Sequence, residues 1–230
     1  MNEAGRRNPN ERTSMSRLIT LIVTLGLAIP PLLAQESPIQ PDLRKLAEGK
    51  GWKVVNRSVT AIEKDGQPSI RFNDGIGIGL AWLEDFTFAN GTIEFDVRGT
   101  NVFQHSFVGV AFHGTDDQTC DAVYFRPFNF KTEDGARRLR AVQSISHPTY
   151  TWSKLRQEQP GKFEKSVVPA PDPNGWFHVR VVVASPKVSV FVNDAKEACL
   201  VAERLSDRQS GRIGFWVDTG GGEFANLKIQ

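Results

Sequence analysis

From Trp52 to the C-terminus, the sequence alternates between apolar and polar residues with a period of two. Representative segments are GTIEFDVR, HSFVGVAFH, WFHVRVVVA and GRIGFWV, all rich in Val, Ile, Phe or Trp. Turn residues such as Asn73-Asp74-Gly75 and Gly220-Gly221-Gly222 separate the segments. Because successive side chains of a β-strand point to opposite faces, this pattern predicts strands with one buried face. Roughly a dozen strands at this spacing predict an all-β fold, a sandwich of two stacked antiparallel sheets.

The chain contains enough apolar material for one large core. Of its 230 residues, 40% are hydrophobic, including 15 Phe and 5 Trp, which excludes a disordered chain. No Pro/Ser-rich linker divides the chain after residue 50. We therefore expect a single domain over residues 51–230, preceded by an N-terminal extension over residues 35–50.

The N-terminus has the features of a signal peptide over residues 1–34. A short positive region precedes an apolar run over residues 18–33, with Met15 as a possible true start and Ala34 as the expected cleavage position. Pro30-Pro31 interrupts a run that is already short for a bilayer, so an uncleaved membrane anchor is the weaker interpretation. We expect an exported protein, periplasmic or secreted, whose mature chain has no membrane span.

The basic character of the chain comes from this leader. The whole sequence has 28 Lys and Arg against 26 Asp and Glu, and removing the four Arg and two Glu of residues 1–34 leaves 24 of each sign. Because nucleic-acid binding depends on neutralising phosphates, a neutral mature domain argues against nucleic acid as a partner. It also argues against an acidic polymer as the obvious ligand.

Cys120 and Cys199 are the two cysteines of the chain. In an exported protein they permit one disulfide, and the alternative is two buried thiols that pack as small apolar residues. Their spacing matches no zinc-binding pattern.

Side-chain parity sorts several segments into a buried and an outward face. Val108, Val110 and Phe112 are expected in the core, opposite Phe107, Gly109, Ala111 and His113. By the same rule, Val123 and Phe125 are core residues and Tyr124 and Arg126 face outward, as do Gly214 and Trp216. The segment over residues 137–146 is ambiguous, because neither parity is consistently apolar.

Several segments together resemble a known superfamily. FANGTIEFDVRG, VGVAFHG, VYFRPFNF and the closing GRIGFWVDTGGGEFANLKI are similar to the concanavalin A-like lectin/glucanase superfamily, and most similar to its exported bacterial laminin-G-like modules and 3-keto-disaccharide hydrolase domains. The resemblance covers roughly residues 50–230. It implies a curved jelly-roll sandwich whose concave face or adjoining loops meet a carbohydrate. It leaves open a binding domain, a glycoside hydrolase or lyase acting on oxidised disaccharides, and a structural or adhesion module without catalysis.

The segment Gly91–Gly99 places Glu94 and Asp96 on one strand face. Retaining glycanases of this superfamily carry three acids at alternate positions of such a strand, because nucleophile and acid must flank one bond about 5 Å apart. Here the third position is Arg98, so that mechanism fails as written. The alternative is an exposed face on which Glu94 and Asp96 pair with Arg or Lys of neighbouring strands.

The outward residues of the central strands predict a saccharide-binding groove. Small residues at Gly109 and Ala111 leave space beside larger polar and aromatic side chains, which suit the hydroxyl groups and C–H faces of a sugar ring. The expected substrate-binding residues are His113, Tyr124, Arg126, Gln143, His147, Tyr150 and Trp152. Each residue alone also has a structural explanation; for example, Arg126 can pair with Glu94 or Asp96.

His113 and Arg126 are the candidate catalytic residues. His113 and His147 are the groove residues whose ordinary pKa lies near neutrality, as proton abstraction next to a sugar carbonyl requires. The residues 146–174 form a long insertion in which the alternation lapses, and such a segment is usually functional or poorly ordered.

No resident cofactor is expected, with one possible exception. The loop carrying Asp116, Asp117 and Asp121 collects three carboxylates, and oxygen-rich loops at sandwich edges can hold calcium. Ordinary turn chemistry explains the same residues.

Overall fold

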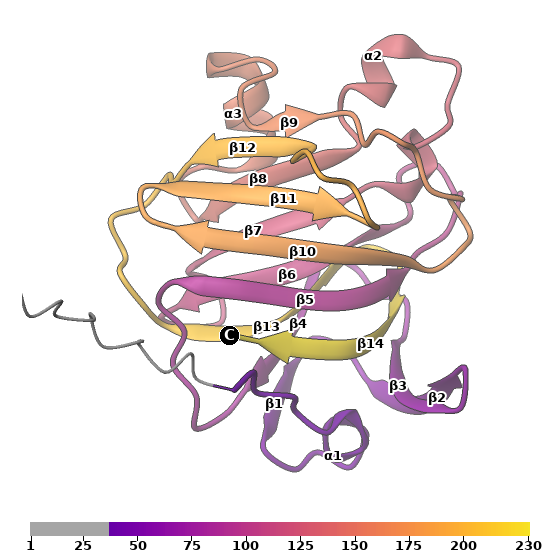
Figure 1. Ribbon diagram of the computed structural model, residues 1–230, viewed down its shortest axis with the longest axis vertical. Coiled ribbons are helices and arrows are strands. Elements are labelled where there is room, and N and C mark those ends of the chain that lie inside the picture. The colour runs from indigo at the N-terminus through magenta and orange to yellow at the C-terminus, as the bar shows by residue number, and fades with distance from the viewer. Residues whose placement is uncertain (1–36) are drawn as a thin grey trace, which may run out of the picture. The chain divides into compact units, whose positions relative to one another are not determined.

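The alternating segments form the strands of a two-sheet sandwich, as the periodicity predicts (Figure 1). The computed structural model of the protein describes residues 37–230, so the predicted signal peptide and the start site at Met15 lie outside the described residues. Within the described part, the strands form two sheets of seven strands each, and neighbouring strands pair antiparallel. The fold is an all-β antiparallel jelly-roll sandwich.

We call the two layers the groove sheet and the back sheet. In spatial order the groove sheet contains β1 (Trp52–Val55), β4 (Ile78–Leu83), β13 (Arg212–Asp218), β6 (Phe107–Gly114), β7 (Cys120–Phe125), β8 (Val142–His147) and β9 (Glu164–Lys165). The back sheet contains β12 (Leu200–Glu203), β11 (Lys187–Val192), β10 (Phe177–Ala184), β5 (Gly91–Arg98), β14 (Gly222–Ile229), β3 (Gln67–Phe72) and β2 (Val59–Lys64).

Aromatic side chains fill the space between the two sheets. Phe95 of β5 packs edge-on against Phe215 of β13 with 6.2 Å between ring centroids, and Phe215 lies 4.4 Å from Phe224 of β14. All three rings are fully buried. Burying one such side chain contributes about 1.5–3 kcal/mol, so the alternating apolar positions account for the association of the two layers.

The outward face of the groove sheet follows a strict register. Trp216 pairs with Gly109, Gly109 with Tyr124, and Tyr124 with Gln143, so these positions form one row across β13, β6, β7 and β8. A Cβ atom at Gly109 would lie 2.1 Å from the Val123 carbonyl oxygen and 2.6 Å from Tyr124 Cα. Glycine is therefore required at position 109, because the Tyr124 side chain extends over β6 at this point to stack on Trp216.

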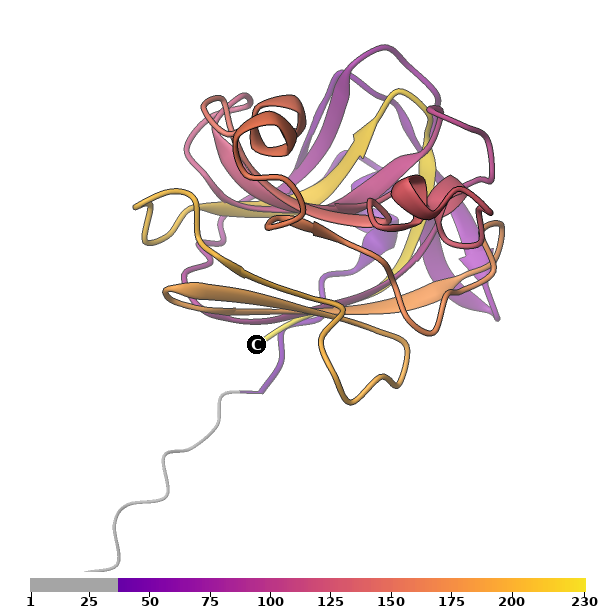
Figure 2. The ribbon, with the colours of Figure 1, turned by 90° about the horizontal axis from the view of Figure 1, so that it is seen from above.

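Two short helices stand over the outer face of the groove sheet. They are α2 (Gly135–Arg138) and α3 (Trp152–Glu158), and Figure 2 shows them on the side of that sheet that faces away from the back sheet. The two helices come from the two long connections that flank β8. They supply walls above an otherwise open sheet face.

The segment over residues 137–146, ambiguous in the sequence, contains two structures. Its first residues belong to α2, where the Asp134 side chain caps the helix by accepting hydrogen bonds from the backbone of Ala136 and Arg137. The strand β8 begins only at Val142. The helical turn explains why neither parity is consistently apolar.

The long insertion over residues 146–174 is ordered. It contains α3 and the short strand β9, which pairs with β8 and extends the groove sheet. Leu155, Phe163 and Val167 are buried. These apolar anchors attach the insertion to the edge of the sandwich.

Residues ahead of the first strand pack against the sandwich. The helix α1 (Leu43–Ala47) buries Leu43 and Leu46 and contacts β2 and β3. Ile39 also pairs with Ile229 at the end of β14. A search of residues 37–230 for a helix long and apolar enough to cross a membrane finds none.

Candidate functional site

A groove of about 570 Å³ lies on the outer face of the groove sheet, between α2 and α3. Four of the residues predicted from sequence line it: Tyr124, Arg126, His147 and Trp152. Other lining residues that the argument below uses are Phe103, Arg137, Arg140, Arg156, Trp216 and Asp218.

The floor of the groove is a buried hydrogen-bond network. The Tyr124 hydroxyl donates to Gln143 Oε1 at 3.0 Å, and Arg126 Nη2 donates to both of these oxygens. Arg126 Nη1 also donates to the Arg140 carbonyl oxygen at 2.9 Å. Gln143 itself lies beneath the groove lining, fully buried. The network holds the guanidinium and the phenol side by side and facing the same space.

Aromatic packing fixes the position of Tyr124. Its ring stacks on Trp216 with 4.6 Å between centroids, and Arg126 lies 4.8 Å from the centre of the same ring. Burial raises the pKa of Tyr124 to about 12. The phenol is therefore a stable hydrogen-bond donor at neutral pH.

Two titratable side chains that line the groove, His147 and Asp218, have shifted pKa values: that of the histidine is lowered and that of the aspartate is raised. Burial lowers the pKa of His147 from 6.5, and the charge of Asp218 opposes the shift. Burial raises the pKa of Asp218 from 3.8, against a hydrogen bond from Thr219 and the charges of Arg57 and His147. Within residues 37–230, His147 forms no side-chain hydrogen bond and Asp218 no ion pair. Both groups are half-buried and open to the groove.

Glu164 is the buried carboxylate beside the groove. It forms a bidentate ion pair with Arg156, at 3.0 and 2.8 Å, and lies 3.7 Å from Arg140 and 3.9 Å from Arg126. One carboxylate thus serves three guanidinium groups that come from the residue after β7, from α3 and from the segment before β8.

Two exposed aromatic rings stand at the groove mouth, each covered by an arginine. Phe103 is 56% exposed and lies 4.1 Å from the Arg137 guanidinium, and Trp152 is 46% exposed and lies 4.9 Å from that of Arg156. Such rings are well suited to stack on a sugar ring.

Tyr150 lies beside the groove and is not part of its lining. It pairs with Ser146 through its backbone, its half-buried ring packs against the core, and Lys154 lies 5.5 Å from the ring centre. The structure therefore does not place Tyr150 among the residues that line the groove.

The expectation that His113 faces outward into the groove is wrong. His113 has a φ of +52°, which interrupts the extended backbone, so the alternation that holds up to Phe112 does not reach it. Its ring is fully buried, with Nδ1 3.0 Å from Asp121 Oδ2 and Nε2 2.6 Å from the Ala89 carbonyl oxygen. Because both ring nitrogens contact oxygen acceptors, His113 cannot serve as a base in the groove.

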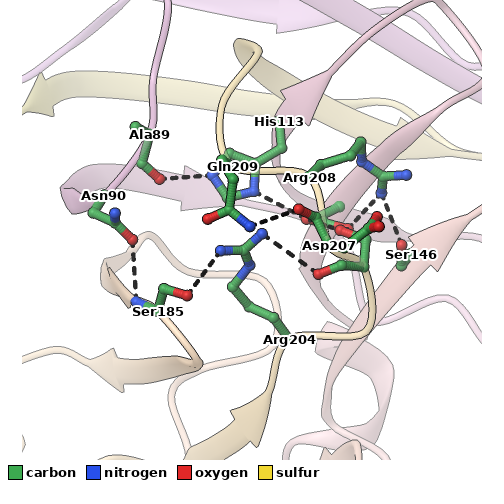
Figure 3. Close-up of polar contacts among 11 residues, drawn as sticks. Ala89, Asn90, His113, Ser146, Ser185, Arg204, Asp207, Arg208 and Gln209 are labelled. Carbon is green, nitrogen blue, oxygen red and sulfur yellow. Dashed lines mark hydrogen bonds and ion pairs between the residues drawn. The ribbon is translucent and has the colours of Figure 1, made fainter.

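His113 belongs to a polar cluster at one end of the sandwich (Figure 3). Asp121 also accepts hydrogen bonds from Ser206 Oγ and Arg208 Nη2, and Arg208 bonds Ser146 as well. These contacts attach the loop before β13 to β7 and β8. The cluster, which we call the structural clamp, therefore has a structural role: it holds this loop against the sheet.

The three carboxylates of the predicted calcium loop are used separately. Asp116 accepts from the backbone of residues 118 and 119, Asp117 pairs with Lys53 and Arg212, and Asp121 is in the clamp just described. Among residues 37–230, no three His, Cys, Asp or Glu side chains converge as metal ligands. Calcium dependence stays a prediction for a chelator experiment.

Glu94 and Asp96 lie on the back sheet, away from the groove. His178 contacts both, at 3.4 and 2.7 Å, and Lys64 lies 3.2 Å from Asp96. Both acids are therefore in ion-pair contacts on a partly buried face; the predicted lysine partner is found for Asp96, on β2, whereas Glu94 contacts the histidine of the neighbouring β10. Arg126 lies on the other sheet, so its predicted alternative pairing with these acids is wrong.

Cys120 and Cys199 are separate thiols in this structure. Burial raises the pKa of each to about 12, as expected for small apolar side chains without a reactive role.

Asp218 is the main site residue that the sequence reasoning missed. A signal existed, because Asp218 follows Trp216 by two positions and must share its outward face. Phe103, Arg137 and Arg156 lie on loops and short helices, where no parity rule places them.

Comparisons with solved structures agree on the fold. A carbohydrate-binding module, CBM66, from Bacillus subtilis is 15% identical with a TM-score of 0.54, over 78% of this chain and 96% of that one. A family 16 glycoside hydrolase endo-glucanase from Bacteroides ovatus is 9% identical with a TM-score of 0.52, over 83% and 97%. A galectin-like protein of unknown function, also from Bacillus subtilis, is 12% identical with a TM-score of 0.54, over 84% and 94%.

Comparison of sequences identifies the family, which the structural comparisons do not. A search of curated proteins found no match. The profile of one family matches residues 42–230, from α1 to the C-terminus, and this family is described as the 3-keto-alpha-glucoside-1,2-lyase-like domain. The resemblance noted from the sequence is therefore confirmed, and the chain belongs to the 3-keto-alpha-glucoside-1,2-lyase-like domain family.

Proposed function

We propose that the groove binds a saccharide and that the protein eliminates the C1 substituent of 3-keto-glycosides. The family description names this reaction, and the fold is shared with carbohydrate-binding and glycan-cleaving proteins. The observation that carries the proposal is that His147 and Asp218 both line the groove, with pKa values shifted in the directions that suit a base and an acid.

The reaction needs three groups around one sugar ring. A ketone at C3 acidifies the hydrogen on C2. A base removes that proton, its electron pair forms a double bond between C2 and C1, and the bond from C1 to the substituent oxygen breaks. The departing oxygen takes a proton from an acid. No oxidant or reductant is consumed.

His147 is the base in this proposal. Its lowered pKa keeps the imidazole neutral near pH 7, and within residues 37–230 its ring nitrogens form no hydrogen bond or ion pair. Neutral imidazole is the usual side chain for removing a carbon-bound proton at this pH.

Asp218 is the acid. Its raised pKa enlarges the protonated fraction of the carboxyl at acidic pH, and that form can donate to the departing oxygen and then recover a proton from solvent through the open groove. Two groups whose environments push their pKa values in opposite directions form a suitable acid–base pair.

Arg126, positioned by Tyr124, stabilises the developing charge. As the C2 proton leaves, negative charge collects on the C3 oxygen. The Arg126 guanidinium, held in place by Tyr124 and Gln143, is a preorganised cationic donor for such an oxygen, because not all of its N–H groups are used in the network. Of the two catalytic candidates from the sequence, Arg126 keeps a role here and His113 does not.

Turnover of methyl 3-keto-α-D-glucopyranoside tests the proposal. The expected product is a conjugated enone, followed by its ultraviolet absorbance and by NMR. His147→Asn and Asp218→Asn should each lower kcat about 100-fold or more, the range expected for loss of acid or base catalysis.

The matched control is His105→Asn. This imidazole is exposed and pairs with Asp74 outside the groove, so the variant should retain wild-type turnover. Wild-type protein that leaves the keto-glucoside intact, or a His147→Asn variant with full activity, contradicts the proposal.

A carbohydrate-binding domain without turnover is the second candidate. The exposed rings of Phe103 and Trp152 favour it, because they offer stacking surfaces independent of any acid or base. Retention on a glycan column without enone formation distinguishes it. A purely structural or adhesion module is less well supported, because α3 forms one wall of the groove and leaves the groove open.

Export remains part of the proposal. It is supported by the apolar run over residues 18–33 alone. N-terminal sequencing of protein recovered from the periplasm or medium should show a chain beginning after Ala34 or Ala28. A cytoplasmic protein with an intact leader contradicts it.

A further inference from the structure

Charged side chains are distributed unevenly around the groove. Four guanidinium groups line it: Arg126, Arg137, Arg140 and Arg156. The carboxylates available to balance them are Asp218 in the lining and Glu164 beneath it. The mature chain as a whole has equal numbers of acidic and basic residues, so this excess is local.

Glu164 cannot balance the three arginines around it. Its two oxygens are taken up by the bidentate pair with Arg156, and Arg126 and Arg140 lie at the longer distances of 3.9 and 3.7 Å. One negative charge faces three positive charges. Two positive charges therefore remain uncompensated beside the floor of the groove.

Arg137 adds a further positive charge at the rim. Its guanidinium lies over the Phe103 ring and donates to the Asn129 side chain at 3.2 Å and the Phe128 carbonyl at 3.3 Å, all neutral groups. Among residues 37–230 it has no carboxylate within ion-pair distance. A guanidinium has five N–H donors, and these contacts use only two.

Asp218 does not restore neutrality. It is half-buried, and no lysine or arginine forms an ion pair with it within the described chain. It is one carboxylate in a lining that holds four guanidinium groups. The lining therefore presents a cationic surface to any occupant.

We infer that the saccharide taken by this groove carries an anionic substituent, a carboxylate or a sulfate or phosphate ester, which binds to Arg137 at the rim. The inference rests on the proposed saccharide function. A planar guanidinium matches a carboxylate or ester oxyanion in two parallel hydrogen bonds, and a partly desolvated site strengthens such pairs. A neutral sugar would leave these cations without a counter-charge.

The rim arginine Arg137 is not explained by catalysis alone. Arg126 lies on the floor beside Tyr124, where it can stabilise an oxyanion on the reacting ring. Arg137 comes from α2, on the wall, and contacts only the aromatic rim and nearby loop atoms. A substituent away from the reacting carbons is the group that it can reach.

Three ligands that differ at one carbon test the inference. Isothermal titration calorimetry compares methyl α-D-glucopyranoside, methyl α-D-glucopyranosiduronate and methyl α-D-glucopyranoside 6-sulfate at low and high NaCl. We expect at least one anionic ligand to bind about tenfold or more tightly than the neutral glucoside, with a preference that declines as salt rises. Comparison of the uronate with the sulfate identifies the source of the charge.

Arg137→Gln should abolish the anion preference while leaving affinity for the neutral glucoside within about twofold. Arg138→Gln is the matched control: it removes the same charge from the same helix, but Arg138 is exposed and contacts only the carbonyls of residues 132 and 133. Circular dichroism melting of each variant shows that folding is intact. An unchanged preference in Arg137→Gln, or an equal loss in Arg138→Gln, overturns the assignment to the rim.

Turnover of the 3-keto-glucoside on the same preparation separates this inference from the proposed function. Turnover with equal affinity for all three ligands overturns the inference and leaves the lyase proposal standing. Preferred anion binding without turnover supports the inference and removes the lyase step. Absence of both turnover and binding overturns both.

Discussion

The rings of Tyr124 and Trp216 stack 4.6 Å apart on the floor of the groove, although their strands are separated by β6. The stack exists because the residue between them in the register is Gly109, which has no side chain to hold them apart. The Tyr124 hydroxyl at the same time forms hydrogen bonds with Gln143 and Arg126. The shape of the groove thus depends on one glycine.

Gly109→Ala should destabilise the protein by on the order of 3 kcal/mol, because the new Cβ would meet backbone atoms that cannot move aside. Urea denaturation measures the free energy of unfolding. The control is Gly135→Ala on α2, where the added methyl group meets nothing within 4 Å and the stability should change little. Equal effects at the two positions would show that Gly109 is not required by packing.

Trp152→Ala should weaken retention on a glycan column by about tenfold, since it removes a 46% exposed ring from the groove mouth without disturbing the core. Trp176→Ala is the control, because this indole lies with Lys64 and Arg98 on the back sheet. Retention that falls equally in both variants would place the saccharide elsewhere.

The rate of elimination should follow a bell-shaped pH profile with its optimum on the acid side of neutrality. The reaction needs neutral His147 and protonated Asp218, and burial moves the pKa of His147 below 6.5 and that of Asp218 above 3.8. The two shifts enlarge the fraction of molecules in the reactive state.

Measured with methyl 3-keto-α-D-glucopyranoside, the acid limb should disappear in His147→Asn and the alkaline limb in Asp218→Asn. Because the two groups influence each other, the limbs report apparent pKa values of the pair. Retention of both limbs in either variant would assign the titration to other groups.

His178 should stabilise the fold at acidic pH. Its hydrogen bond to Asp96 raises its pKa above 6.5, and the pKa of Asp96 is lowered to about 2 although burial opposes that shift. A group with a raised folded-state pKa contributes its full stabilisation below 6.5 and loses it as the pH rises through the folded value. Because His178 is 39% exposed, the effect should stay below about 1 kcal/mol.

The measurement is the free energy of unfolding in urea from pH 5.5 to 8.5, with Asp96 ionised throughout. The difference between wild type and His178→Asn should be largest at pH 5.5 and decline with rising pH. Taking this difference removes the contribution of His147, which has the opposite sign. A difference independent of pH would show that the imidazole acts only by packing.

Most of the fold was predictable from the sequence, because a two-residue period records which face of a strand is buried. Tyr124, Arg126 and Trp216 lie on the predicted outward face, and Val123, Phe125 and Phe215 in the core. The rule fails at His113, where a positive φ turns the backbone out of the extended conformation. It also fails to describe residues 137–141, where the Asp134 cap starts a helical turn.

The sequence by itself determined the sandwich, the outward face and the net neutrality of the domain, since these follow from local alternation and from counting charges. The tertiary structure alone decided which outward residues share a groove. Asp218 and His147 come from strands far apart in the sequence, and Arg137 and Arg156 come from short helices without periodicity. Their meeting depends on strand order and loop closure, which are properties of the whole chain.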